Sequence, residues 1–155
     1  MPPRLARLER IHVRTPIYFV TACTAERKPI LARKEIHAAL VLFAQKGPAL
    51  GAWIGTYVLM PDHFHLFVAL DDALPLSGWA RSLKGVLSSE LRLMGIPAPH
   101  WQKGFFDHVL RSDESATQKW DYIRANPVRA GLVRRWEEWP YAGEIFPLEF
   151  RSERL

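Results

Sequence analysis

His63 and His65 are the residues of this chain whose type and spacing are best suited to chemistry. They flank Phe64 and precede the apolar run at 66–70, a pattern typical of a buried β-strand. Because strand residues alternate faces, both imidazoles are expected to point the same way, with Cα atoms about 6.6 Å apart. Two imidazoles at that spacing can bind one metal ion. The alternative is an ordinary pair of structural histidines.

Tyr122 and Asn126 form a second candidate group, because residues four apart lie on one face of a helix. If that helix packs over the open face of the sheet, the amide oxygen of Asn126 joins His63 and His65 as a third ligand, with the phenol beside them. Mixed nitrogen and oxygen ligation suits Mn²⁺, and Mg²⁺ is acceptable where waters complete its octahedron. The structural alternatives are a half-buried packing tyrosine and an Asn that ends a helix before Pro127.

The elements that must position these residues follow the order β-α-β-β-α-β, with one helix appended. Strands are expected over 17–24, 52–60, the histidine stretch to 70, and 105–111; helices are expected over 34–46, 75–94 and 113–126. Only Pro61 and Asp62 separate the second and third strands, which predicts a tight antiparallel hairpin. The order predicts an α+β fold of the ferredoxin-like, RRM-like type, with a split β-α-β arrangement. Its four-stranded antiparallel sheet is covered on one face by two helices, with the appended C-terminal helix left over.

Length and composition limit the class of protein. A chain of 155 residues that is 48% apolar predicts one packed domain over 1–155, with a basic N-terminal arm at 1–14 and a helical C-terminal extension at 112–155. The net charge of +5 favours a polyanionic partner, nucleic acid first. Cys23 is the only cysteine, which excludes an intramolecular disulfide and a thiolate zinc cluster. Without a signal peptide or a long apolar stretch, a cytoplasmic protein is expected.

Three stretches with ordered spacing carry a resemblance to a known family. They are VLMPDHFHL at 58–66, WQKGFFDH at 101–108 and YIRANPVRAGLV at 122–133. Together they resemble the single-tyrosine transposases with a His-hydrophobic-His (HUH) site, most closely the REP-associated branch related to transposases of small insertion sequences. One such motif alone is a weak signal, whereas three in order are a strong one. Other members carry Asn where this chain has Asp62 and often His where it has Arg124; neither position is a proposed ligand or nucleophile.

The resemblance implies a metal-dependent enzyme that cleaves and transfers single-stranded DNA. It implies that His63, His65 and Asn126 bind Mg²⁺ or Mn²⁺, and that Tyr122 attacks the scissile phosphate to give a 5′-phosphotyrosine intermediate and a free 3′-hydroxyl. The implied substrate is a single-stranded DNA hairpin with a flanking guide sequence, typical of repetitive extragenic palindromes, bound by a monomer or a homodimer. Our candidates for DNA backbone contacts, chosen for their charge, are Arg81, Lys84, Arg111, Arg129, Arg134 and Arg135.

Two other classes of function remain open at this point. One is a catalytically idle nucleic-acid-binding module that stacks bases on its aromatic side chains. The other is a metal-dependent phosphodiesterase in which water is the nucleophile and Tyr122 only packs. A covalent protein-DNA adduct distinguishes the transposase from the hydrolase, because water leaves no such bond.

Overall fold

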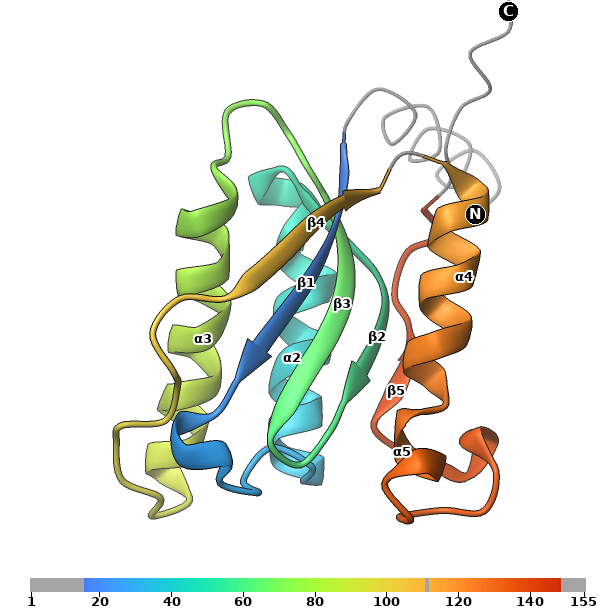
Figure 1. Ribbon diagram of the computed structural model, residues 1–155. Helices are drawn as coiled ribbons and strands as arrows, with labels where there is room; N and C mark the ends of the chain where they lie inside the picture. The colour runs from blue at the N-terminus through green and yellow to red at the C-terminus, as the bar shows by residue number, and fades with distance from the viewer. Residues whose placement is uncertain (1–15, 111, 149–155) are drawn as a thin grey trace, which may run out of the picture.

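The computed structural model describes residues 16–110 and 112–148, so the basic arm at 1–14, Arg111 and residues 149–155 lie outside the described residues. Five strands form one antiparallel sheet in the order β4-β1-β3-β2-β5 (Figure 1). The strands are β1 (Ile17–Cys23), β2 (Ala52–Leu59), β3 (His63–Leu70), β4 (Phe106–Leu110) and β5 (Ala142–Glu144). The helices are η1 (Ala25–Arg27), α2 (Lys34–Lys46), η2 (Gly47–Leu50), α3 (Leu76–Leu93), α4 (Asp113–Arg124), α5 (Asn126–Arg129) and η3 (Trp136–Glu138).

The predicted ferredoxin-like fold is confirmed, with one strand more than the four expected. β4, β1, β3 and β2 form the split β-α-β sheet, and β2 and β3 pair antiparallel across the short Pro61-Asp62 turn. β5 then pairs with the outer edge of β2, where Tyr57 lies opposite Gly143. A three-residue strand is too short to show an alternating pattern, and it forms here because β2 offers unpaired backbone groups at its edge.

The helix expected over 113–126 is instead two helices, which corrects that prediction. α4 starts after Ser112, whose Oγ accepts a hydrogen bond from the Ser115 N–H at 3.1 Å and so satisfies one free donor of the first turn. α4 ends at Arg124, Ala125 caps it, and α5 begins at Asn126 with Pro127 in its first turn. Proline is tolerated there because the first N–H groups of a helix have no partner within the helix. Pro127 therefore restarts the helix rather than stopping it.

The main core lies between the sheet and helices α2 and α3. Phe64, Leu66 and Val68 of β3 are buried on this side, as the strand alternation predicted. α2 and α3 each present an apolar stripe at helical spacing, for example Leu83 and Leu87 of α3. Both histidines of β3 must then face the other side of the sheet.

α4 covers part of that other face, near β2 and β5 (Figure 1). Ile123 is its anchor: the side chain is 1% exposed and belongs to a cluster with Phe19 and Val58. Because Tyr122 precedes Ile123 in the helix, burial of the isoleucine fixes the rotation of α4 about its axis. The packing of one apolar residue thus determines where the phenol can lie.

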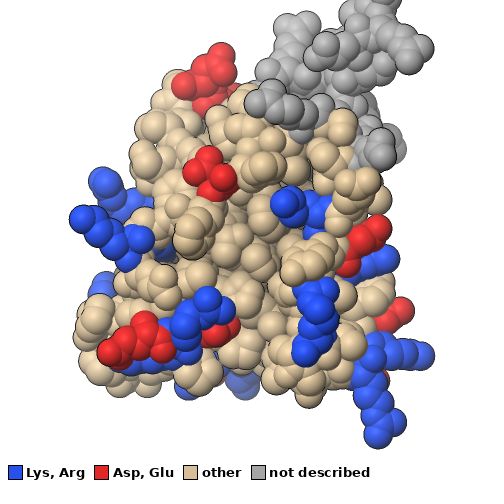
Figure 2. All heavy atoms as spheres, in the orientation of Figure 1, with Lys and Arg blue, Asp and Glu red and all other residues tan. Residues whose placement is uncertain are grey.

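The net charge of +5 is spread unevenly over the surface. On the face drawn in Figure 2, Lys and Arg atoms lie toward α3 on one side and over α4 and α5 on the other, with mostly uncharged surface between them. Within the described part of the chain, no helix combines the length and the apolar character needed to cross a bilayer.

Candidate active site

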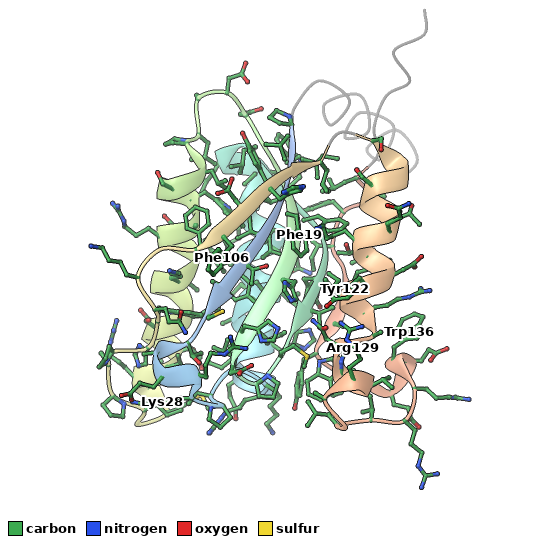
Figure 3. The ribbon with its side chains drawn as sticks, viewed as in Figure 1. Phe19, Lys28, Phe106, Tyr122, Arg129 and Trp136 are labelled. Carbon is green, nitrogen blue, oxygen red and sulfur yellow. The ribbon has the colours of Figure 1, made fainter. Side chains whose placement is uncertain are left out.

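The side chains of the candidate site come from β1, β3, α4 and α5, and Figure 3 labels three of the residues that frame it, Phe19, Tyr122 and Arg129. His63 and His65 lie on β3 with ring centroids 4.8 Å apart and an interplanar angle of 78°. Their predicted common orientation is therefore confirmed. Each ring is partly exposed, and neither is packed into the main core. Both rings are therefore accessible to one ion.

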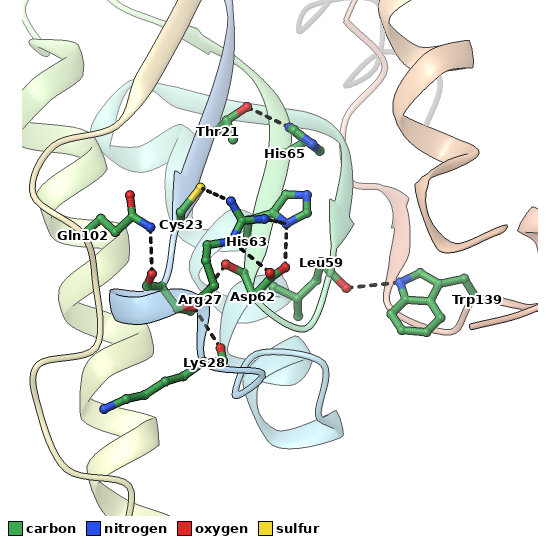
Figure 4. A network of polar contacts seen from close by, with 11 residues as sticks. Thr21, Cys23, Arg27, Lys28, Leu59, Asp62, His63, His65, Gln102 and Trp139 are labelled. Atoms are coloured by element: carbon green, nitrogen blue, oxygen red, sulfur yellow. Dashed lines mark hydrogen bonds and ion pairs between the residues drawn. The ribbon is translucent and has the colours of Figure 1, made fainter. Parts of the chain in front are cut away.

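His63 is oriented by Asp62. The Nδ1 of His63 lies 2.8 Å from Oδ1 of Asp62, and a carboxylate only accepts, so Nδ1 carries the proton and donates it. The Nε2 lone pair then remains available to a metal. Arg27 in turn donates from Nε to Oδ2 of Asp62 at 2.9 Å (Figure 4). Although burial raises the pKa of the Asp62 carboxyl, the hydrogen bonds from Arg27 and His63 outweigh it and hold that pKa below its usual value.

Arg27 reaches Asp62 from a strained turn after β1. Glu26 and Arg27 have φ angles of 56° and 55°, a left-handed conformation that costs residues other than glycine roughly 1 to 2 kcal/mol each. The buried Thr24 stabilises this turn: its N–H donates to the Asp62 carbonyl at 2.9 Å, and its hydroxyl lies 2.9 Å from the carbonyl oxygen of Lys28. These hydrogen bonds hold the turn against the β2-β3 hairpin. The left-handed conformation of the turn places the guanidinium of Arg27 beside His63.

His65 has its own partners on β1. Its Nδ1 lies 2.7 Å from Oγ1 of Thr21, the residue directly opposite in the β1-β3 pairing, and Phe19 stacks on its ring at a centroid distance of 5.3 Å. Burial first, then neighbouring positive charges including Lys119 and Arg129, lower the pKa of His65 to about 3. The imidazole is therefore neutral at pH 7, the form in which histidine binds metals.

The guanidinium of Arg129 contacts both Tyr122 and Asn126. Tyr122 is 64% exposed near the end of α4, and the Arg129 Cζ lies 4.2 Å from the centroid of its ring. The Nη2 of Arg129 donates to Oδ1 of Asn126. The charge of Arg129 also lowers the pKa of His65. The structure thus places α4 on the sheet face to which both histidines point, and Arg129 contacts both Tyr122 and Asn126; the roles of the predicted nucleophile and the three predicted metal ligands stay predictions.

The donor set fits the predicted ion. Among residues 16–110 and 112–148, no group of three or more His, Cys, Asp or Glu side chains is placed to hold a metal. A third protein ligand for an ion at His63 and His65 would therefore be of another type, and the amide oxygen of Asn126 is the one predicted from the sequence. Two neutral imidazoles and one amide oxygen suit Mn²⁺, or Mg²⁺ completed by waters.

A groove of about 410 Å³ opens beside Tyr122 on the β4 side of α4. It is lined by His108, Leu110, Ser115, Gln118, Lys119 and Tyr122. The Nζ of Lys119 lies 5.2 Å from the ring centroid of Phe19, which itself stacks on His65. The groove therefore combines the phenol of Tyr122 with the cation of Lys119, which suits a chain of phosphates.

The predicted DNA-contact residues near this face are Arg129, Arg134 and Arg135. Arg129 lies inside the site itself, as described above. Arg134 and Arg135 are exposed in the segment after α5, where their backbone N–H groups both donate to Oε1 of Glu138 at 3.1 Å. Arg111 lies outside the described residues.

Arg81 and Lys84 lie elsewhere, on α3, which packs against the opposite face of the sheet. Arg81 is exposed. Lys84 donates to the carbonyl oxygens of Gln102, at 3.3 Å, and Gly104, and burial lowers its pKa. The structure does not bring these two residues to the histidine site, and DNA contact by them stays a prediction.

The sequence analysis missed Thr21, Arg27 and Lys119. Thr21 could have been found, because a strand pairing that aligned β1 with β3 would place it opposite His65. Lys119 lies one turn before Tyr122 in α4, a spacing that was available in the sequence. Arg27 gave no signal, because it reaches Asp62 only through the left-handed turn.

Comparisons with known proteins bear on the family and the fold of this chain. A family profile described as "Transposase IS200 like" matches residues 12–126, a range that contains both histidines, Tyr122 and Asn126 and ends before Arg129. A REP-associated tyrosine transposase of Escherichia coli K12 is 26% identical, over 96% of this chain and 93% of its own length. A solved structure of a REP-associated tyrosine transposase bound to a REP hairpin is similar with a TM-score of 0.68 at 21% identity. This structural match covers 90% of this chain and 87% of the chain in the solved structure.

Proposed function

Because this chain belongs to the family of IS200-like transposases, we propose that it is a metal-dependent endonuclease and strand transferase acting on single-stranded DNA hairpins, of the kind that REP sequences form. One observation carries the proposal: α4, which carries the exposed Tyr122, packs on the face of the sheet to which both imidazoles point, and the Nδ1 atoms of these imidazoles are both engaged by neighbouring side chains. A transposase of this type needs both parts, a nucleophile open to DNA and a site that neutralises the phosphate.

In the proposed mechanism the protein contributes orientation and a nucleophile. His63, His65 and Asn126 would hold Mg²⁺ or Mn²⁺, which when bound polarises the scissile phosphate. Asp62 holds His63 in the tautomer that exposes Nε2. The oxygen of Tyr122 attacks the phosphorus and loses its proton; the tyrosine O–P bond forms while the bond from phosphorus to the 3′-oxygen breaks. That 3′-oxygen takes up a proton, and attack by another 3′-hydroxyl reverses the step and joins strands.

The exposure of Tyr122 supports this proposal over the hydrolase alternative. A tyrosine that only packs α4 against the sheet would be buried, as its neighbour Ile123 is at 1%, whereas Tyr122 is 64% exposed. Its ring contacts a guanidinium and lines the groove rather than filling the apolar layer. The phenol is therefore accessible to a phosphate group. An idle binding module would have no need of this arrangement.

The experiment is cleavage of single-stranded hairpins taken from beside the protein's own gene, in Mn²⁺ or Mg²⁺, followed by a denaturing gel. The parent is expected to remain attached to the 5′ side of the break. Tyr122→Phe removes one oxygen and almost no volume, so it is expected to fold and bind DNA but form neither cleaved strand nor adduct. The matched control is Tyr18→Phe, because Tyr18 packs on the α2-α3 side of the sheet. Cleavage by Tyr122→Phe near the parental rate would indicate that water, and not Tyr122, is the nucleophile.

A further inference from the structure

Arg129 is shared by two residues of the proposed site. Its guanidinium lies over the Tyr122 ring, 4.2 Å from the centroid, while Nη2 donates to Oδ1 of Asn126. That oxygen is the atom with which Asn126 would bind a metal. In the free protein, therefore, a cation already occupies the position from which the third ligand has to act.

Arg129 forms no ion pair with a carboxylate of the described residues. Among the ion pairs of residues 16–110 and 112–148, none involves Arg129. Arg124 offers the contrast: it pairs with Asp121 at 3.2 Å and lies over Trp136 at 4.6 Å. The Arg129 side chain is exposed, and its contacts within the described part of the chain are with a neutral amide and a ring. Moving it therefore breaks no ion pair.

A divalent ion and this guanidinium cannot both use Asn126 without strong repulsion, because like charges a few ångströms apart repel even near the surface. The Arg129 charge also acts on His65, whose imidazole would hold the same ion. A phosphate group offers the Arg129 guanidinium a different partner. A planar guanidinium binds phosphate oxygens through two parallel hydrogen bonds, and a guanidinium stacked on Tyr122 is already next to the nucleophile.

We propose that Arg129 is a positioning residue that exchanges partners: it occupies Asn126 in the free protein and moves to the scissile phosphate when a metal ion takes the amide oxygen. The inference rests on the proposed function, because it needs a metal at the histidine pair and a phosphate beside Tyr122. It assigns to Arg129 a competition with the metal, which a residue that merely contacts the DNA backbone would not show.

The exchange predicts two opposite effects of Arg129→Met, which keeps the length of the side chain but removes the charge and the donors. Without DNA, Mn²⁺ is expected to bind about tenfold more tightly by isothermal titration calorimetry, since no hydrogen bond to a charged donor has to break and no cation repels the ion. With DNA at saturating Mn²⁺, cleavage is expected to fall at least tenfold, because the phosphate loses its clamp. Arg129→Lys, which restores the charge, is expected to return Mn²⁺ affinity to the parental value.

Two controls make the result decisive. Arg124→Met removes the same charge from α4 and is expected to change Mn²⁺ affinity less than twofold, because its partners are Asp121 and Trp136. His65→Ala is expected to lose Mn²⁺ binding. If His65→Ala loses it while Arg129→Met binds Mn²⁺ no better than the parent, the exchange is wrong and the proposed function stands. If His65→Ala binds Mn²⁺ like the parent, the metal site itself is wrong, and the exchange with it.

Discussion

Removal of the Ile123 side chain tests whether α4 is an independently docked layer that positions the nucleophile. The side chain is 1% exposed between α4 and the sheet. Ile123→Ala deletes three carbons, which costs about 2.4 kcal/mol of transfer free energy at about 0.8 kcal/mol per methylene. The residual cavity adds to this, so about 3 kcal/mol is expected. The other α4 residues that pack there, Ala116 and Trp120, are only partly buried and do not replace the lost contact, because side chains in a close-packed core cannot move far.

The substitution is expected to weaken the docking of α4 on the sheet and to leave the core between the sheet and helices α2 and α3 unchanged. Amide hydrogen exchange measures this directly, because local opening has its own free energy. At a factor of ten per 1.4 kcal/mol, protection of the α4 amides is expected to fall about 140-fold. The amides of α2 and α3 are expected to change far less. Cleavage of hairpin DNA is expected to fall with the docked fraction, since an undocked α4 cannot present Tyr122 to the histidine pair.

Leu87→Ala is the matched control, because Leu87 is equally buried but belongs to the α2-α3 core. It is expected to lower protection in the sheet and in all helices together. The reasoning is refuted if Ile123→Ala reduces protection in α2 and α3 as much as in α4. In that case the two apolar layers unfold as one unit, and Ile123 does not specifically position the nucleophile.

Three further predictions concern the histidine pair. Thr21→Val removes the oxygen that faces Nδ1 of His65, so Mn²⁺ affinity is expected to fall 10- to 100-fold by calorimetry; an unchanged affinity would show that Thr21 does not orient the ring. Asp62→Asn keeps an oxygen acceptor for His63 and is expected to keep Mn²⁺ affinity within a few-fold, whereas Asp62→Ala is expected to lose 10- to 100-fold; equal affinities for the two variants would argue against the tautomer assignment. The pKa of His65 is about 3 in the folded protein against 6.5 when unfolded, so protonation favours the unfolded chain and stability is lost as pH falls below 6.5. Urea unfolding without metal is expected to show a loss of about 2 kcal/mol between pH 7 and pH 5 that His65→Asn lacks.

The sequence alone determined the features that depend on local periodicity. Alternation along 63–70 placed Phe64 in the core and both histidines on the opposite face, because side chains of a strand point alternately to its two sides. The order of strands and helices predicted the ferredoxin-like sheet, whereas the single helix expected to carry both Tyr122 and Asn126 is divided into α4 and α5. Both confirmed features follow from residues within one element or its immediate neighbours.

The tertiary structure alone decided how the distant parts of the site meet. Thr21 lies opposite His65 only because β1 and β3 pair in one register, and Arg27 reaches Asp62 only from a left-handed turn that no local pattern predicts. Arg129 lies on Tyr122 because Pro127 starts a second helix instead of ending the first. These contacts depend on how segments far apart in the chain pack together. Such packing cannot be predicted from the periodic pattern of residues within one segment.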